Sequence, residues 1–206
     1  MAVDLICATR GEAGERLGVA DDINTGKARE AELRAAAAIT GIRDIYLLGY
    51  IDGQLQTADP GKMADRVLGV MRWVRPGIVI TFGPDGITSH PDHIAIGKAA
   101  RHVFEALCRD DDSKRKLYYV TVPESAVRDG NELRVATRPD TEVTTRIDIS
   151  EQLDAKLWAM AAHRSQPGAA TFIAMLESDR RSPMATTEHL YLALPNGATD
   201  ETDLFA

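Results

Sequence analysis

The stretch GIVITFGPDGITSHPDHIAIGKAARHVF, residues 77–104, decides the fold because a strand gives way to a helix within it. Residues 77–82 are apolar and rich in β-branched side chains, and they form the most strand-like, most buried-looking run in the chain. Pro91 suits the first position of a helix, and an apolar stripe from Ile96 to Leu107 predicts that the helix continues. A strand, a polar loop and a helix in this order are typical of α/β proteins.

The remaining chain repeats this alternation. Further strands are predicted at residues 3–9, 44–50, 116–122 and 188–194, and further helices at residues 27–40, 63–74, about 148–163 and 171–178. Residues 123–141 read as an excursion or hairpin outside the main layers, and residues 199–206 as an acidic tail. The pattern predicts one α/β domain over residues 1–206, with a mostly parallel sheet and helices on both faces.

Composition limits the partners. The net charge is −7 and the isoelectric point is near 5.2, which argues against a nucleic-acid partner because that binding needs clustered cations. The chain has two cysteines, without metal-type pairing or a disulfide framework. It shows no run of about 18 apolar residues and no signal-peptide pattern. We therefore expect a soluble, cytoplasmic protein with no membrane partner, acting on a small molecule or another protein.

Polar residues gather in three loops that leave the carboxyl ends of predicted strands. The loops are Arg10 to Glu15, Tyr50 to Gly53 and Gly83 to His93. Ligands of open α/β sheets usually bind beyond these strand ends. The sequence therefore predicts the site in these loops.

His90 and His93 lie at the start of the predicted helix, one at the cap and one in the first turn. Residues three apart face the same way, and a neutral imidazole is the commonest metal ligand in proteins. An ordinary polar helix start fits the same residues, because Ser89 is a good cap and Asp92 favours the helix dipole. Spacing alone leaves both interpretations open.

The other histidines do not complete a metal site by sequence pattern. A hydrolytic zinc site normally takes three protein ligands. His102, His163 and His189 form no second pair, so they are interpreted as structural or solvated.

Taken together, the segments RGEAGE, REAELRAAAAITGI, LLGYIDG, residues 76–104 and AAHRSQ resemble the PIG-L/LmbE-like deacetylases in kind and order. The resemblance covers nearly the whole chain. It implies a Rossmann-like three-layer fold, a Zn²⁺ ion and removal of an acetyl group from an N-acetylglucosamine-type conjugate. It is also compatible with a homo-oligomer.

The resemblance assigns roles to individual residues. His93 resembles the zinc ligand, His90 the second histidine at the reacting carbonyl, and Asp92 the carboxylate that orients His90; Arg29, Asp52 and, less closely, Glu12 resemble substrate-binding residues. Two of these have an equally ordinary alternative. Arg29 can be a surface arginine paired with Glu30 or Glu32, and Asp52 can be a turn residue before Gly53.

One departure from the family pattern is large. The family opens with a strand and helix carrying an A-H-P-D-D-E motif, which supplies two zinc ligands and the general base, whereas this chain enters VDLICAT directly after Met1 and Ala2. We therefore expect a chain that lacks the opening β-α unit, either as a truncated record of an enzyme or as a degenerate relative. We favour the truncated record, because the substrate-side loops persist. We also expect weak or absent zinc binding and little activity in this chain.

Two other classes remain as alternatives. A nucleotide-binding enzyme is disfavoured because TRGEAGERLG matches neither G-x-G-x-x-G nor the P-loop. A non-catalytic binding or assembly protein of the same fold is consistent with the missing ligands.

Overall fold

A computed structural model describes residues 2–15, 24–110, 114–127, 135–195 and 200–205. The chain divides into two compact units. The first comprises Met1–Gly53 and Ile149–Thr186, and the second comprises Gln54–Asp148 and Thr187–Ala206. The single domain predicted for residues 1–206 stays a prediction.

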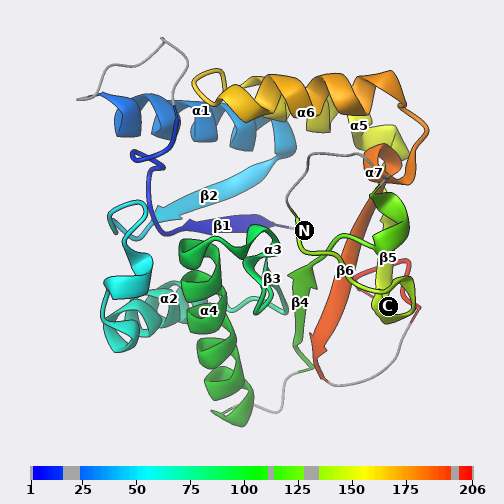
Figure 1. The fold of residues 1–206 in the computed structure, drawn as a ribbon. Coiled ribbons are helices and arrows are strands. Elements are labelled where there is room, and N and C mark those ends of the chain that lie inside the picture. Colours follow the sequence, from blue (N-terminus) through cyan, green and yellow to red (C-terminus); the bar gives the residue numbers. More distant parts are fainter. Residues whose placement is uncertain (1, 16–23, 111–113, 128–134, 196–199, 206) are drawn as a thin grey trace. The chain divides into compact units, whose positions relative to one another are not determined.

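The first unit is built on two parallel strands. β1 (Val3–Cys7) and β2 (Ile42–Leu47) pair in parallel and are joined by α1 (Thr25–Thr40) (Figure 1). The helix ends at Gly41, whose φ of 73° is left-handed and therefore favours glycine. The helix predicted over residues 27–40 is confirmed, with its stop at Gly41.

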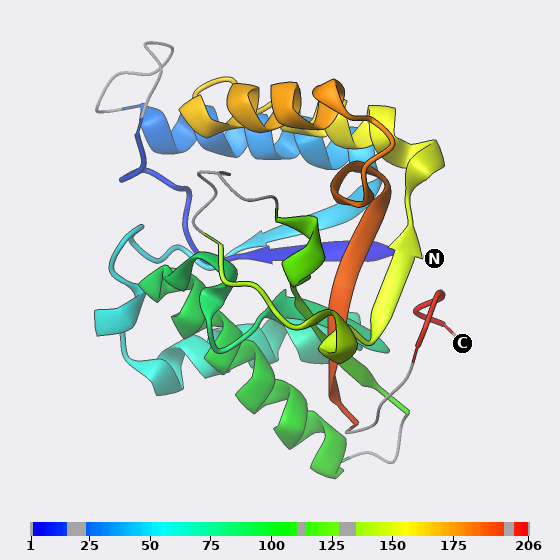
Figure 2. The same cartoon turned by 45° about the vertical axis from the view of Figure 1, so that its right-hand side comes forward.

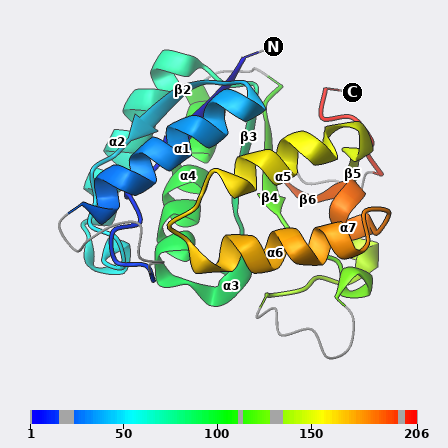
Figure 3. The same ribbon diagram turned by 90° about the horizontal axis from the view of Figure 1, so that it is seen from above.

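Helices complete this unit. They are the short η4 (Ser150–Gln152), then α5 (Leu153–Ala161), α6 (Pro167–Ser178) and α7 (Pro183–Thr186). α5 contacts both α1 and α6 (Figure 3). Leu153, Leu157, Leu176 and Ala185 form their buried core. The two helices predicted in this region are confirmed, although α5 is shorter than expected and α6 begins four residues earlier, at Pro167.

The second unit holds a four-stranded mixed sheet. Its strands are β3 (Ile78–Phe82), β4 (Lys116–Val120), β5 (Thr145–Asp148) and β6 (Thr187–Leu194), in the order β3-β4-β6-β5. β3 and β4 are parallel, whereas β6 runs antiparallel to both β4 and β5. β5 and β6 lie side by side in Figure 2. The α/β class is confirmed, but parallel pairing stops at β4. The sequence missed β5, because four residues with a mixed polar pattern are too short to signal a strand.

The most buried strand of this sheet is β4, not β3. Leu117, Tyr118 and Tyr119 of β4 are at most 4% exposed, whereas Ile80 of β3 is 47% exposed. β3 forms one edge of its sheet, so an apolar run there is only partly covered. The prediction that residues 77–82 form the most buried strand is therefore wrong, although the strand itself is confirmed.

Helices of the second unit follow the predicted apolar stripes. η1 (Leu55–Thr57) leads into α2 (Pro60–Val74), and the short α3 (Gly86–Ser89) precedes α4 (Pro91–Asp110). α2 starts earlier than predicted, because the Asp59 carboxylate accepts hydrogen bonds from the amides of Gly61 and Lys62. α2 packs along α4, which in turn contacts β3 (Figure 1). Across the described ranges, no helix is long and apolar enough to cross a membrane.

The predicted excursion at residues 123–141 belongs to the second unit; its residues 128–134 fall outside the described ranges. It contains two single turns, η2 (Glu124–Ala126) and η3 (Asp140–Glu142). A bridge joins Pro123 to Arg138, and the amide of Ala136 donates to the Ile87 carbonyl at 2.6 Å. This segment therefore braces the turn that precedes α4.

Glu201 fixes the C-terminal segment to the sheet. Its carboxylate accepts hydrogen bonds from Tyr118 (2.6 Å), Lys116 (2.9 Å) and Thr145 (3.1 Å). Burial alone would raise the pKa of Glu201, but the hydrogen bonds from Tyr118, Lys116 and Thr145 outweigh it and lower the pKa below the ordinary 4.5. Burial and the same carboxylate raise the pKa of the Tyr118 hydroxyl. The acidic tail predicted at residues 199–206 thus contributes an anchored carboxylate.

We expect Glu201→Gln to lower the free energy of unfolding by about 2 kcal/mol at pH 7, because it removes charge-assisted hydrogen bonds. The folded pKa of Glu201 is depressed, so its contribution is present above pH 4.5 and is lost as the pH falls through the folded value. Urea denaturation at pH 7 and at acidic pH measures both effects. The control is Asp200→Asn, whose side chain is 86% exposed and whose loss should cost less than about 0.5 kcal/mol. Equal stabilities of the two variants would contradict the role of Glu201.

Candidate active site

The turn between β3 and α4 presents the two histidines. The Asp85 carboxylate accepts from the Ile87 amide at 2.6 Å, and Ile87 and Ser89 have left-handed φ values of 61° and 56°. Such values are unfavourable for a β-branched residue, and the strain is about 1–3 kcal/mol. α4 then begins at Pro91, with the Ile94 amide donating to the carbonyl of His90 at 3.1 Å. The predicted helix start, with Pro91 in its first turn, is confirmed.

His93 is held with one ring nitrogen available to a ligand. Its Nδ1 lies 3.0 Å from the carbonyl oxygen of Gly86, and its ring stacks on Phe82 with centroids 4.1 Å apart. A carbonyl oxygen only accepts hydrogen bonds, so Nδ1 carries the proton in the neutral ring. The lone pair is therefore on Nε2, as in most metal-binding histidines.

His90 has the opposite tautomer. The backbone amide of Asp92 donates to Nδ1 of His90 at 3.2 Å, so in the neutral ring the proton is on Nε2. The two imidazole centroids are 5.1 Å apart, as the spacing of three residues predicted. The pair thus combines a lone pair on His93 with an N–H donor on His90.

Asp92 connects this turn to a second loop. Its side chain is buried, and its carboxylate accepts from the backbone amide of Leu55 at 3.0 Å. The resemblance implied that the carboxylate orients His90, whereas the contact described above comes from the backbone amide of the same residue. Asp92 therefore positions the start of α4, and an orienting role of its carboxylate toward His90 stays a prediction.

The zinc site expected from the resemblance is incomplete among the described residues. His93 fits a zinc ligand by its tautomer, but no group of three His, Cys, Asp or Glu side chains able to hold a metal occurs within these ranges. A zinc ion needs three or four such ligands. His93 by itself is therefore insufficient to hold a zinc ion.

In the first unit, Glu12 and Asp52 tie two loops together. One Asp52 oxygen accepts from the amide of Ala13 at 3.0 Å and the other from the Thr9 hydroxyl at 3.2 Å. Glu12 in return accepts from the amide of Asp52 at 3.3 Å. Gly53, with a φ of 78°, confirms the predicted turn after Asp52. The loops after β1 and β2 therefore meet, and their carboxylates shape them.

Arg29 lies against the loop after β1 and is not a surface arginine. It is 9% exposed and donates to the carbonyls of Gly11 and Glu15, the latter at 2.6 Å. The alternative of an Arg29 ion pair with Glu30 or Glu32 is wrong, because both carboxylates bond elsewhere. Glu30 accepts hydrogen bonds from Arg10 and Arg34, which lower its pKa, the bond from Arg10 having the larger effect. Substrate contact by Arg29, Asp52 and Glu12 stays a prediction.

Glu32 is a buried, hydrogen-bonded carboxylate that the sequence did not indicate as a site residue. It is buried on α1 and accepts from Ser165 through both the amide (2.8 Å) and the hydroxyl (2.7 Å). Nearby, Nδ1 of His163 lies 3.2 Å from the Gln166 amide nitrogen. The AHRSQ motif is therefore anchored to α1. An acidic residue on the Ala36 side of the helix was the signal that could have revealed it.

The predicted site residues fall into two groups, one in each unit. Glu12, Arg29 and Asp52 lie together in the first unit, and His90, Asp92 and His93 lie together in the second. The meeting of the two groups at one site stays a prediction.

The sequence profile of the family GlcNAc-PI de-N-acetylase, or PIG-L, matches residues 1–104. A 1D-myo-inositol 2-acetamido-2-deoxy-alpha-D-glucopyranoside deacetylase from Acidothermus cellulolyticus is 33% identical over 249 aligned positions, which cover 99% of this chain and 84% of the relative. The chain belongs to the PIG-L family. The expected membership is thereby confirmed.

Two solved structures share the fold of this PIG-L family member. The 4-carboxy-2-hydroxymuconate hydratase GalB from Pseudomonas putida has a TM-score of 0.67 at 19% identity, covering 95% of this chain and 85% of its own. The N,N'-diacetylchitobiose deacetylase from Pyrococcus horikoshii has a TM-score of 0.63 at 19% identity, covering 93% and 72%. They confirm the Rossmann-like α/β fold. Because one is a hydratase and the other a deacetylase, this fold alone does not define the reaction.

We expect nitrogen-15 NMR, recorded with both imidazole rings neutral, to show the proton of His93 on Nδ1 and that of His90 on Nε2. The Gly86 carbonyl imposes the first tautomer and the Asp92 amide the second. Long-range proton–nitrogen correlation spectra distinguish the tautomers directly. The same tautomer on both rings would contradict the complementary arrangement.

Gly14→Ala should lower the free energy of unfolding by about 2 kcal/mol, because a Cβ there would overlap the Arg29 guanidinium and displace it from its two carbonyl acceptors. The matched control is Gly69→Ala on α2, where a Cβ meets nothing within 4 Å. That exchange should instead raise stability by about 0.5–1 kcal/mol. Urea denaturation measures both, and a stabilising Gly14→Ala would contradict the packing of Arg29.

Proposed function

We propose that this PIG-L family member serves the hydrolysis of an N-acetyl amide on an N-acetylglucosamine-type conjugate. The observation that carries the proposal is the pair of complementary imidazoles at the start of α4. The matching relative from Acidothermus cellulolyticus, a deacetylase of an inositol-linked acetamido sugar, supports the substrate class.

The two histidines suit separate tasks in amide hydrolysis. Nε2 of His93 has the lone pair that a metal ligand needs, so His93 is the residue of this pair that would contribute to holding a zinc ion. His90 presents Nε2–H, which can donate to the amide oxygen as negative charge develops on it. After water adds to the carbon and the C–N bond breaks, the proton that the departing amine requires comes from that water.

Asp92 is a positioning residue in this proposal. Its carboxylate holds Leu55, and its own amide holds the His90 ring, so both contacts fix where His90 points. Glu12, Arg29 and Asp52 are proposed as the residues nearest the sugar. Their loops follow the carboxyl ends of β1 and β2, where α/β sheets bind ligands.

A second candidate is a non-catalytic binding or assembly protein of the same family. The lack of a three-ligand group among the described residues supports it. The cytoplasm as the location and a homo-oligomer as the assembly remain predictions of the same kind.

The test compares the 206-residue chain with a longer version in which a strand–helix unit carrying an A-H-P-D-D-E motif precedes Met1. We expect the 206-residue chain to hold little zinc and to release little acetate from N-acetylglucosaminyl-inositol. The longer version should hold about one zinc ion, because two further ligands join His93. Elemental analysis and an acetate assay measure the two quantities.

In the longer version, His93→Ala should lose zinc, whereas His90→Ala should keep zinc and lower kcat by about 10²–10³-fold. The control is Arg72→Gln, an exposed side chain on α2, which should change neither. Stoichiometric zinc in the 206-residue chain would overturn the incomplete ligand set. Zinc without acetate release in the longer version would favour the binding protein.

A further inference from the structure

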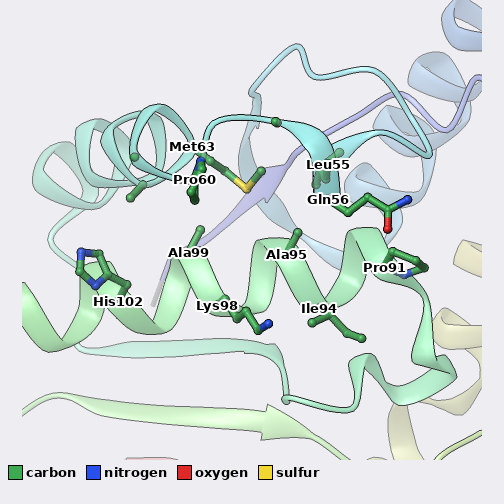
Figure 4. Close-up of a pocket in the computed structure, with 13 residues that line it drawn as sticks. Leu55, Gln56, Pro60, Met63, Pro91, Ile94, Ala95, Lys98, Ala99 and His102 are labelled. Atoms are coloured by element: carbon green, nitrogen blue, oxygen red, sulfur yellow. The ribbon is translucent and has the colours of Figure 1, made fainter.

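A pocket of about 690 Å³ lies between α2 and α4, within the second unit. Figure 4 shows Ala95 and Ala99 pointing from α4 toward Leu55 and Met63 on the opposite wall. Its size is in the range of small-molecule sites, about 300–1,000 Å³. Neither His90 nor His93 lines it, so the pocket is separate from the histidine pair.

The pocket exists because small side chains face each other where two helices pack. Ala95 and Ala99 contribute only methyl groups on α4, and Gly61 contributes no side chain at the start of α2. Leu55 and Met63, on the wall opposite α4, are each 2% exposed. The buried Asp92 carboxylate accepts from the amide of Leu55, so a hydrogen bond within the protein holds this wall.

The pocket lining is mostly apolar and, in the described ranges, has one cationic side chain. Most lining side chains are apolar, and within the described part of the chain no acidic side chain lines the pocket. Of the described lining residues, Lys98 is the one lysine or arginine, and it is exposed at the rim. Among the described residues it has no hydrogen-bond or ion-pair partner. An apolar ligand body with one anionic group is therefore complementary to the pocket.

The shape of the pocket favours an elongated ligand. On α4 the lining runs from Pro91 to His102, eleven residues apart, which corresponds to about 16 Å along a helix. A chain-like ligand can follow this line between the two helices and place its charged end at Lys98.

We propose that the pocket between α2 and α4 binds a medium-chain aliphatic carboxylate. The alkyl chain lies on Leu55, Met63, Ala95 and Ala99, and the carboxylate pairs with Lys98. This site is additional to the deacetylase function proposed above and does not depend on it, because it uses neither the histidine pair nor a metal.

Calorimetry with octanoate tests the site in the 206-residue chain. We expect one octanoate per chain, weaker binding of the neutral octanamide, and no binding of octyltrimethylammonium. Lys98→Gln should weaken octanoate binding about fivefold, which corresponds to an exposed ion pair, and should leave octanamide unchanged. Lys27→Gln, an exposed lysine on α1, is the matched control and should bind octanoate like the unaltered chain.

Ala95→Leu adds bulk inside the pocket and should abolish binding of both octanoate and octanamide. Ala95 is only partly buried, and circular dichroism verifies that the variant is folded. If Ala95→Leu does not fold, Lys98→Gln alone decides through the ratio of the octanoate and octanamide affinities. The proposal is overturned if octanoate does not bind, if folded Ala95→Leu still binds it, or if Lys98→Gln leaves that ratio unchanged.

Discussion

The hydrogen bond between the Leu55 amide and the Asp92 carboxylate is the interaction on which the second unit depends. Asp92 is 6% exposed, sits in the first turn of α4 and accepts from the amide of Leu55 in a loop 37 residues earlier. A buried carboxylate without a hydrogen-bond donor is costly. The hydrogen bond from the Leu55 amide therefore stabilises the start of α4. It joins three features: the start of α4, the orientation of His90 through the adjoining amide, and the wall of the pocket that Leu55 lines.

Arg29 has the corresponding position in the first unit. Its guanidinium fills the interior of the RGEAGE loop and bonds to two backbone carbonyls, which explains why glycine stands at position 14. Glu12 and Asp52 then join that loop to the loop after β2. In both units a buried charged side chain organises backbone groups that a loop would otherwise leave without partners. In their described residues, the loops that the sequence marks as functional are therefore held by side-chain hydrogen bonds to the backbone.

Chemical function in the histidine turn comes from tautomers, not from residue types alone. His90 and His93 are the same residue three positions apart, yet one carries its proton on Nε2 and the other on Nδ1. The difference arises from backbone partners, an amide for His90 and a carbonyl for His93. The strained Ile87 turn places that carbonyl, and the bracing contact from Ala136 holds the turn. Two identical side chains thereby become a donor and a lone-pair ligand.

The sequence alone determined the α/β class, most helices and strands, the helix start at Pro91 and the loops in which the polar residues gather. These follow from local rules: periodicity, capping, and the φ values that proline and glycine allow. The family resemblance, carried by ordered motifs, was sufficient to identify the PIG-L family.

Only the tertiary structure decided which strand is buried, where Arg29 and Glu32 place their charges, and which nitrogen of each histidine is protonated. Each of these depends on partners distant in the chain: β4 lies between β3 and β6, Glu32 bonds to Ser165, and Asp92 bonds to Leu55. Local sequence patterns describe how a segment can fold, whereas burial and hydrogen-bond partners are set by segments that meet only in the folded chain.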